Sequence, residues 1–204
     1  MNKTIMKLPN TVEILLILVI VSFTSCRTQS PVIQVMQSNE TTLQHWQTFS
    51  APDGAFSIDF PAKPVEQRYS IGSPSGKLEV YSNKYTGSAS YFISYTDYPL
   101  AIDGADVARA ALEHARDGGL KQVNGRLVKE SAISIQGHPG TLLVVDSPNG
   151  GPQGSTIKNK VYLVGCRLYS MQVAIPKDTP EPQSLDAAAE KFLDSFKLAA
   201  TAKN

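Results

Sequence analysis

From residue 46 onward, short segments of alternating apolar and polar residues follow one another, and turn-forming residues separate them. Residues 46–50 and 55–60 flank a Pro-Asp-Gly turn, and residues 156–164 and 167–175 flank Gly165-Cys166. Alternation with a period of two predicts strands with one buried face, and connections this short join antiparallel neighbours. The sequence therefore predicts a mainly antiparallel sheet built from hairpins.

Five more segments complete the predicted sheet, and several turns and loops separate them. The segments span residues 67–71, 77–85, 90–98, 121–135 and 141–146, with turns at 73–76 and 137–140. Residues 90–98 are rich in aromatic side chains, which favour a strand. Residues 147–154 are rich in glycine and proline, and they predict a mobile loop.

Two segments, residues 106–117 and 185–198, have helical periodicity instead. Each carries an apolar stripe, at positions 107, 108, 111, 112 and 115 and at positions 185, 188, 189, 192, 193 and 196. Asp103 or Asp106 is expected to cap the first helix and Gly118-Gly119 to end it, while Ser184 is expected to cap the second. The order strands, helix, strands, helix predicts an α+β fold with helices packed on the sheet.

Near the N-terminus, an unbroken apolar run at residues 14–21 follows Lys3 and Lys7. A membrane-spanning helix needs about 20 apolar residues, whereas the core of a signal peptide takes about 7–15. The run leads to Phe23-Thr24-Ser25-Cys26, which resembles the lipobox of bacterial lipoproteins. In that family the cysteine thiol receives a diacylglycerol and becomes the mature N-terminus. The resemblance implies a signal peptide at residues 1–25 and lipidation at Cys26.

Residues 26–44 are then the lipidated N-terminus and a flexible tether, because they are polar and rich in Ser, Thr and Gln. Several acyl chains hold a protein stably on a bilayer, so the expected location is extracytoplasmic, on a bacterial membrane. The alternative interpretation is a simple anchor helix followed by an incidental cysteine. Since the chain has 2 cysteines, lipidation of Cys26 leaves Cys166 without a disulfide partner.

Residues 45–200 are predicted to form a single domain. Of the 204 residues, 42% are hydrophobic and 18% are charged, which is typical of a folded protein. The net charge of +1, from 19 Lys and Arg against 18 Asp and Glu, gives no electrostatic footprint for nucleic acid. We therefore expect no nucleic-acid partner.

The polar residues of the domain form no recognisable catalytic or metal-binding motif. His45, His114 and His138 lack the spacing of metal ligands. Residues 150–154 are glycine-rich but lack the Lys-Ser/Thr pair of a phosphate loop. The sequence thus predicts neither a metal nor a cofactor.

The remaining candidates for chemistry are serines, acidic residues and one thiol. Ser170 and Ser195 lack the context of a nucleophile elbow. Solvated surface positions are expected for Asp146, Asp178, Glu181 and Asp186. No catalytic residue is therefore predicted.

Cys166 is expected at an exposed hairpin tip. An intermolecular disulfide or a redox contact is one interpretation. A tolerated turn residue is the favoured one, because no base or resolving cysteine flanks the thiol. The tyrosines at 81, 85, 91, 95 and 98 alternate along strands, and a core role is favoured over a partner surface.

Three segments together resemble the PsbP-like and DcrB-like group of small extracytoplasmic proteins. They are residues 46–61 (WQTFSAPDGAFSIDFP), 162–169 (YLVGCRLY) and 192–198 (FLDSFKL), which match the first hairpin, the late hairpin and the closing helix of that group. The resemblance covers residues 46–198 and implies an antiparallel sheet between helices, an α/β/α sandwich. The group includes extrinsic subunits of photosystem II, bacterial lipoproteins and a Ran-binding import factor. Their shared property is binding to other proteins, and no site residue carries over to this chain.

The sequence thus favours a non-enzymatic lipoprotein that binds or stabilises a membrane-associated protein assembly. One alternative is a carrier of a small apolar ligand in the periplasm, with a pocket between sheet and helix. Another is an enzyme whose polar constellation the sequence spacing hides, for example a pocket that joins His138 with Asp or Ser side chains.

Overall fold

The computed structural model describes residues 45–73, 76–99 and 104–199. Cys26, the expected signal peptide 1–25 and the expected tether 26–44 lie outside the described residues, as does Asp103. The helices are α1 (Ala105–Gln122) and α2 (Pro182–Asp194). The strands are β1 (Gln47–Ser50), β2 (Phe56–Phe60), β3 (Val65–Ser73), β4 (Gly76–Thr86), β5 (Ser90–Asp97), β6 (Arg126–Ile135), β7 (His138–Ser147), β8 (Ser155–Val164), β9 (Arg167–Pro176) and β10 (Lys197–Leu198).

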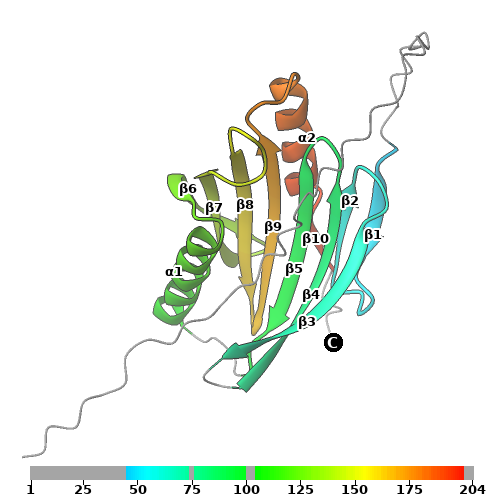
Figure 1. Cartoon of the computed structure of the whole chain (residues 1–204). Helices are drawn as coiled ribbons and strands as arrows, with labels where there is room; N and C mark the ends of the chain where they lie inside the picture. The colour runs from blue at the N-terminus through cyan, green and yellow to red at the C-terminus, as the bar shows by residue number, and fades with distance from the viewer. Residues whose placement is uncertain (1–44, 74–75, 100–103, 200–204) are drawn as a thin grey trace, which may run out of the picture.

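A seven-stranded antiparallel sheet in the order β3-β4-β5-β9-β8-β7-β6 forms the centre of the domain (Figure 1). A smaller antiparallel sheet places β2 between β1 and β10. The smaller sheet joins the start of the domain to its end, because β2 and β10 lie far apart in the chain. This architecture confirms the expected α+β fold with a mainly antiparallel sheet.

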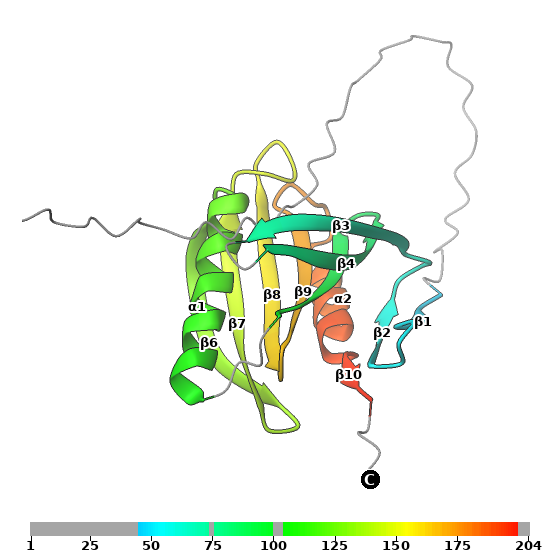
Figure 2. The same cartoon turned by 90° about the horizontal axis from the view of Figure 1, so that it is seen from below.

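The two helices lie on opposite faces of the large sheet. Figure 2 shows β7, β8 and β9 between α1 and α2. Side chains alternate between the faces of a strand, so Val161 of β8 packs near Leu112 of α1, whereas its neighbour Tyr162 joins the cluster that contains Phe192 of α2. The fold is therefore the expected α/β/α sandwich.

Aromatic side chains fill the layer between α2 and the sheet. Phe192 is fully buried, with ring centroids 5.0 Å from Phe60 and 5.4 Å from Tyr91. Phe196 stacks on Tyr162 at 6.0 Å. The chain's own rings thus fill the layer between α2 and the sheet.

The first helix is longer than predicted, and its ends differ from the expected ones. Gly118-Gly119 lies inside α1, which continues to Gln122, because Leu120 packs on the cluster around Val123. That contact offsets the cost of a glycine in a helix, about 1 kcal/mol each. The N-cap is Gly104 without a side-chain hydrogen bond, so Asp106 is a residue of the first turn, not the cap.

The second helix also differs at both ends. It begins at Pro182, a residue whose fixed φ suits the first helical turn, so Ser184 lies within the helix and is not its cap. It ends at Asp194, and Ser195 is its C-cap: the Ser195 N–H still donates to the Lys191 carbonyl, while its hydroxyl donates to the Phe192 carbonyl and accepts the Asp59 N–H at 2.9 Å. Residues 197–198 form β10 and not a helix.

Two strand boundaries were also wrong. Residues 121–122 belong to α1, so β6 begins at Arg126. The turn after β6 consists of Gln136 and Gly137, both with positive φ, and the predicted turn residues 138–140 belong to β7. Gly140 lies under the Tyr162 ring, where a Cβ atom would approach the ring to 2.5 Å.

The glycine-rich loop at 147–154 is held by side-chain hydrogen bonds. Ser147 Oγ and Asn149 Nδ2 both donate to the Val123 carbonyl, at 2.8 and 2.9 Å, and Ser155 Oγ donates to the Asn149 carbonyl. Gly150 and Gly154 have positive φ. The two glycines therefore allow the backbone to turn within a loop that side-chain hydrogen bonds hold in place.

Candidate functional site

The structure places the three histidines on separate elements. His45 precedes β1, His114 is exposed on α1, and His138 begins β7. Within residues 45–73, 76–99 and 104–199, no three His, Cys, Asp or Glu side chains group closely enough to hold a metal ion. The histidines thus do not assemble a site with one another.

The serines and acidic residues considered from sequence have structural contacts. Ser170 is buried and its hydroxyl donates to Asn159 Oδ1 at 3.2 Å, while Ser195 ends α2. Asp186 pairs with Lys158 at 2.6 Å. Asp146 binds Arg126 and Lys177, and the Lys177 hydrogen bond, followed by that of Arg126, lowers the pKa of its carboxyl.

Cys166 lies exposed at the tip of the β8–β9 hairpin, as predicted, and is a free thiol. Its backbone carbonyl accepts the Tyr98 N–H at 2.8 Å. This bond attaches the hairpin tip to the end of β5. The thiol itself has no role in that contact.

A row of aromatic residues crosses the sheet on the face that α2 covers. In this row Arg68, Tyr81, Tyr95, Tyr169 and Tyr162 are direct cross-strand partners on successive strands β3, β4, β5, β9 and β8. Tyr95, Tyr169 and Tyr162 are buried, and Tyr81 is half-buried. The core or cross-strand role expected for the tyrosines is confirmed for Tyr91 and Tyr95, which are buried, and for Tyr81, which is the cross-strand partner of Tyr95. The row itself ends in the open at Arg68.

Two guanidinium groups stack on the first two rings of this row, Tyr81 and Tyr95. Tyr81 and Tyr95 are parallel at 4.9 Å. The Arg68 guanidinium lies 4.7 Å from the Tyr81 centroid, and that of Arg167 lies 4.5 Å from the Tyr95 centroid. Cation–π attraction therefore stabilises both ends of the tyrosine pair.

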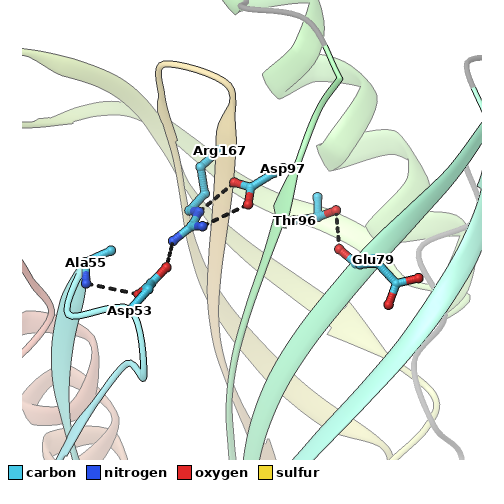
Figure 3. A network of polar contacts seen from close by, with 6 residues as sticks. All are labelled: Asp53, Ala55, Glu79, Thr96, Asp97 and Arg167. Atoms are coloured by element: carbon cyan, nitrogen blue, oxygen red, sulfur yellow. Dashed lines mark hydrogen bonds and ion pairs between the residues drawn. The ribbon is translucent and has the colours of Figure 1, made fainter.

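Arg167 joins three segments of the chain, as Figure 3 shows. Its guanidinium donates two hydrogen bonds to Asp97 of β5, at 2.6 and 2.8 Å, and one to Asp53 in the β1–β2 turn, at 2.5 Å. The Asp97 hydrogen bonds are the main cause that raises the pKa of Arg167, so it stays protonated. Burial alone raises the pKa of Asp53, but the hydrogen bonds from Arg167 and the Ala55 N–H outweigh it and lower that pKa.

A pocket of about 290 Å³ opens beside this network. It is lined by Pro52 of the β1–β2 turn, by Glu66 and Arg68 of β3, by Tyr81 and Asn83 of β4, and by Tyr95 of β5. Arg167 and Asp53 hold the turn that carries Pro52 against the sheet. The Arg167 network thus fixes one wall of the pocket.

The pocket contains an unsatisfied polar group. Asn83 is only 5% exposed, and within the described residues its buried Oδ1 atom has no hydrogen-bond partner. Glu66 lies directly across the strand pair from Asn83 on the same face and is exposed. An exposed carboxylate and a buried amide with an unpaired oxygen therefore lie side by side at this part of the pocket.

The sequence did not reveal this site, because its residues carry no motif. Asn83 and Glu66 become neighbours only through the register of the β3–β4 pair, and Asp53 and Arg167 lie 114 positions apart. Alternation placed Tyr81 and Tyr95 on strands, which is the only local signal for the site.

The comparisons with known proteins place the fold. No known family model and no curated protein matches the chain. The solution structure of cyanobacterial PsbP (CyanoP) from Synechocystis sp. PCC 6803 is similar, with a TM-score of 0.50, 12% identity, and coverage of 80% of this chain and 98% of that chain. This likeness confirms the expected PsbP-like fold.

A crystal structure from Bacteroides thetaiotaomicron VPI-5482 also matches, more weakly. The TM-score is 0.35 and the identity is 14%, and the match covers 76% of this chain and 49% of that chain. Separately, no helix in the described part of the chain is long and apolar enough to cross a bilayer.

Proposed function

We propose that this protein is an extracytoplasmic lipoprotein whose PsbP-like domain is a non-catalytic binding module. In this proposal, acyl chains on Cys26 hold the domain beside a bacterial membrane, residues 26–44 act as the tether, and the domain stabilises a membrane-associated protein assembly. In this proposal the chain shares its binding role with the PsbP-like and DcrB-like group that its sequence resembles.

The observation that carries the binding role is the pocket beside the Arg167 network. Folded proteins pair nearly all of their buried polar atoms, yet Asn83 Oδ1 has no partner among the described residues, and Asn83 lines a pocket that opens to solvent. The PsbP-like fold supports the proposal as an analogy of architecture. The lipobox at Phe23-Thr24-Ser25-Cys26 supports the membrane location.

The mature protein from membranes tests the anchor. We expect its intact mass to correspond to a chain that begins at Cys26 and carries acyl groups, and we expect the Cys26→Ser variant to leave the membrane fraction. A mature chain that begins elsewhere, or that carries no acyl mass, contradicts the anchor.

Crosslinking in intact membranes, followed by purification in detergent, tests the binding role. We expect the same partner protein to be recovered in replicate experiments with the wild-type chain. Cys26→Ser is the matched control, because it keeps the domain unchanged and removes the thiol that lipidation requires. Failure to recover a reproducible partner from wild-type membranes contradicts the proposal.

A further inference from the structure

We infer that the pocket between the β1–β2 turn and the β3–β4 pair binds a cationic side chain, the ammonium of a lysine or the guanidinium of an arginine, presented by the partner protein. This inference rests on the proposed function and deepens it, since it names the chemistry that the pocket recognises.

Within the described residues, no group donates a hydrogen bond to the Asn83 oxygen. Asn83 is 5% exposed, and its Oδ1 atom is buried. The torsion that orients an Asn amide is broad, so rotation about it exchanges the buried oxygen with the NH2 group and brings the oxygen to the pocket when a donor arrives. A ligand that satisfies Asn83 is therefore a hydrogen-bond donor.

Glu66 is the cross-strand partner of Asn83. Directly opposite side chains on one face of an antiparallel pair have Cβ atoms about 5 Å apart. Within the described part of the chain, the exposed Glu66 carboxylate has no ion-pair or hydrogen-bond partner. A group inserted between Glu66 and Asn83 meets two acceptors, one of them charged.

Arg68 is the cation at the pocket rim. Its Nε donates to Glu79 at 3.1 Å, and its guanidinium covers the Tyr81 ring. The Ser70 hydroxyl also donates to Glu79, and this hydrogen bond, followed by that of Arg68, lowers the pKa of the Glu79 carboxyl. Arg68 is thus neutralised by its own carboxylate and leaves Glu66 unpaired.

The charged side chains around the pocket are more often negative than positive. On the same sheet face, Arg167 is matched by both Asp53 and Asp97. When Glu66 and Glu79 are included, four carboxylates face three cations, the two guanidiniums and the ammonium of Lys77 beside Glu79. The excess of negative charge favours a cation over an anion. A volume of about 290 Å³ admits one long side chain, and the edges of Tyr81 and Tyr95 offer apolar contact for its aliphatic stem.

The test uses the full chain, labelled with ¹⁵N at asparagine and tyrosine, in detergent micelles. The probes are Nα-acetyl-lysine methylamide and Nα-acetyl-arginine methylamide. The control probes are the corresponding norleucine and glutamate compounds, and spermidine represents a free polyamine. We expect saturable shifts at Asn83, Tyr81 and Tyr95 with a blocked lysine or arginine, and no shifts with norleucine or glutamate.

Three variants sharpen the test. Glu66→Gln removes the carboxylate from an exposed position, and Asn83→Leu removes the amide while keeping a similar volume. Each should weaken the probe by about tenfold or more, as expected for loss of a hydrogen bond to a charged group. Glu113→Gln, on the exposed face of α1, is the matched control and should leave the shifts unchanged.

A thermal measurement accompanies Asn83→Leu, because a buried substitution can change the fold. We expect a melting temperature equal to or above that of the wild type, since an unsatisfied acceptor is removed. If that variant does not fold, Glu66→Gln decides alone.

Several results overturn the inference. They are no shift with either cation, equal shifts with the glutamate probe, shifts with spermidine alone, or equal weakening by Glu66→Gln and Glu113→Gln. These results leave the proposed function intact if the crosslinked partner is still recovered. Loss of that partner in wild-type membranes, in contrast, contradicts the proposed function whatever the probes show.

Discussion

Replacing Arg167 by glutamine tests whether its side chain holds the β1–β2 turn against the large sheet. The guanidinium is the common partner of Asp97 and Asp53, and it stacks on Tyr95 at 4.5 Å. Glutamine keeps a polar side chain, but it is shorter than arginine and has neither the charge nor the guanidinium fork. The substitution therefore leaves Asp53 and Asp97 facing one another without a cation.

The magnitude follows from the exposure of each partner. The Arg167 side chain is 19% exposed, but those of Asp53 and Asp97 are 39% and 46% exposed, so solvent screens both ion pairs. Each pair then contributes about 0.5–1 kcal/mol, and the stacking on Tyr95 contributes about 0.5–1 kcal/mol. We expect Arg167→Gln to lower the free energy of unfolding by about 2 kcal/mol at pH 7, a fall in melting temperature of roughly 4–8 °C.

The pH dependence provides a second readout with a defined sign. The pKa of Asp53 is lower in the folded protein than its ordinary value of 3.8, because the Arg167 and Ala55 hydrogen bonds outweigh burial. A lowered carboxyl pKa stabilises the fold above the unfolded value, and this contribution is lost as pH falls through the folded value. The gap between wild type and Arg167→Gln should therefore narrow below about pH 4.

Urea unfolding between pH 7 and pH 2.5 measures both effects. A double-mutant cycle with Asp53→Asn isolates the Arg167–Asp53 coupling from the rest of the network. Equal stability of wild type and Arg167→Gln at pH 7, or a gap that does not change with pH, refutes the reasoning.

Three further substitutions probe the packing. Gly140→Ala places a Cβ 2.4 Å from the Val161 carbonyl and 2.5 Å from the Tyr162 ring, so we expect a loss of about 2 kcal/mol in urea unfolding. Gly119→Ala has open space and lies inside α1, so the same assay should show a gain of about 0.5–1 kcal/mol. Lys158→Met removes ion pairs to Asp186 at 2.6 Å and Glu190 at 2.5 Å, and should cost about 1 kcal/mol at low salt. That last difference should shrink when melting is repeated in 1 M NaCl, as screening requires.

The sequence predicted the elements whose signals are local. The hairpin tip at Gly165-Cys166 was correct because Gly165 adopts φ +60, a conformation that glycine tolerates best. The apolar stripe of the last helix was also correct: Leu185, Ala189, Phe192 and Leu193 are buried. In both cases a residue's neighbours within one turn decide its conformation.

Where tertiary contacts compete with local preference, the sequence misled. A glycine pair is a strong helix stop, but the burial of Leu120 carries α1 through Gly118-Gly119. Residues 197–198 have helical periodicity with α2, yet their backbone pairs with β2. A strand that comes from more than a hundred positions away supplies these hydrogen bonds, and periodicity contains no information about it.

The pocket is even harder to predict from sequence, since its residues form no local motif. Asn83 was one polar residue in a strand until the register placed it opposite Glu66 and beneath the aromatic row. Within the described residues, Tyr91 Oη and Gln122 Oε1 are the other buried side-chain atoms without partners, and neither residue lines this pocket. Burial raises the pKa of Tyr91 to about 12, so its hydroxyl stays neutral among the core rings.

A buried acceptor without a partner costs about 1–3 kcal/mol, which is a large share of the stability of a small domain. Leucine at position 83 avoids that cost, so asparagine is the less stable choice for the free protein. The unpaired Asn83 oxygen lies beside the turn that Arg167 holds, beside Arg68, which Glu79 neutralises, and beside the unpaired Glu66 carboxylate. These groups leave room for a donor. A domain that tolerates this cost recovers it only when a partner occupies the pocket, and the stability of Asn83→Leu measured with and without the lysine probe gives both halves of that balance.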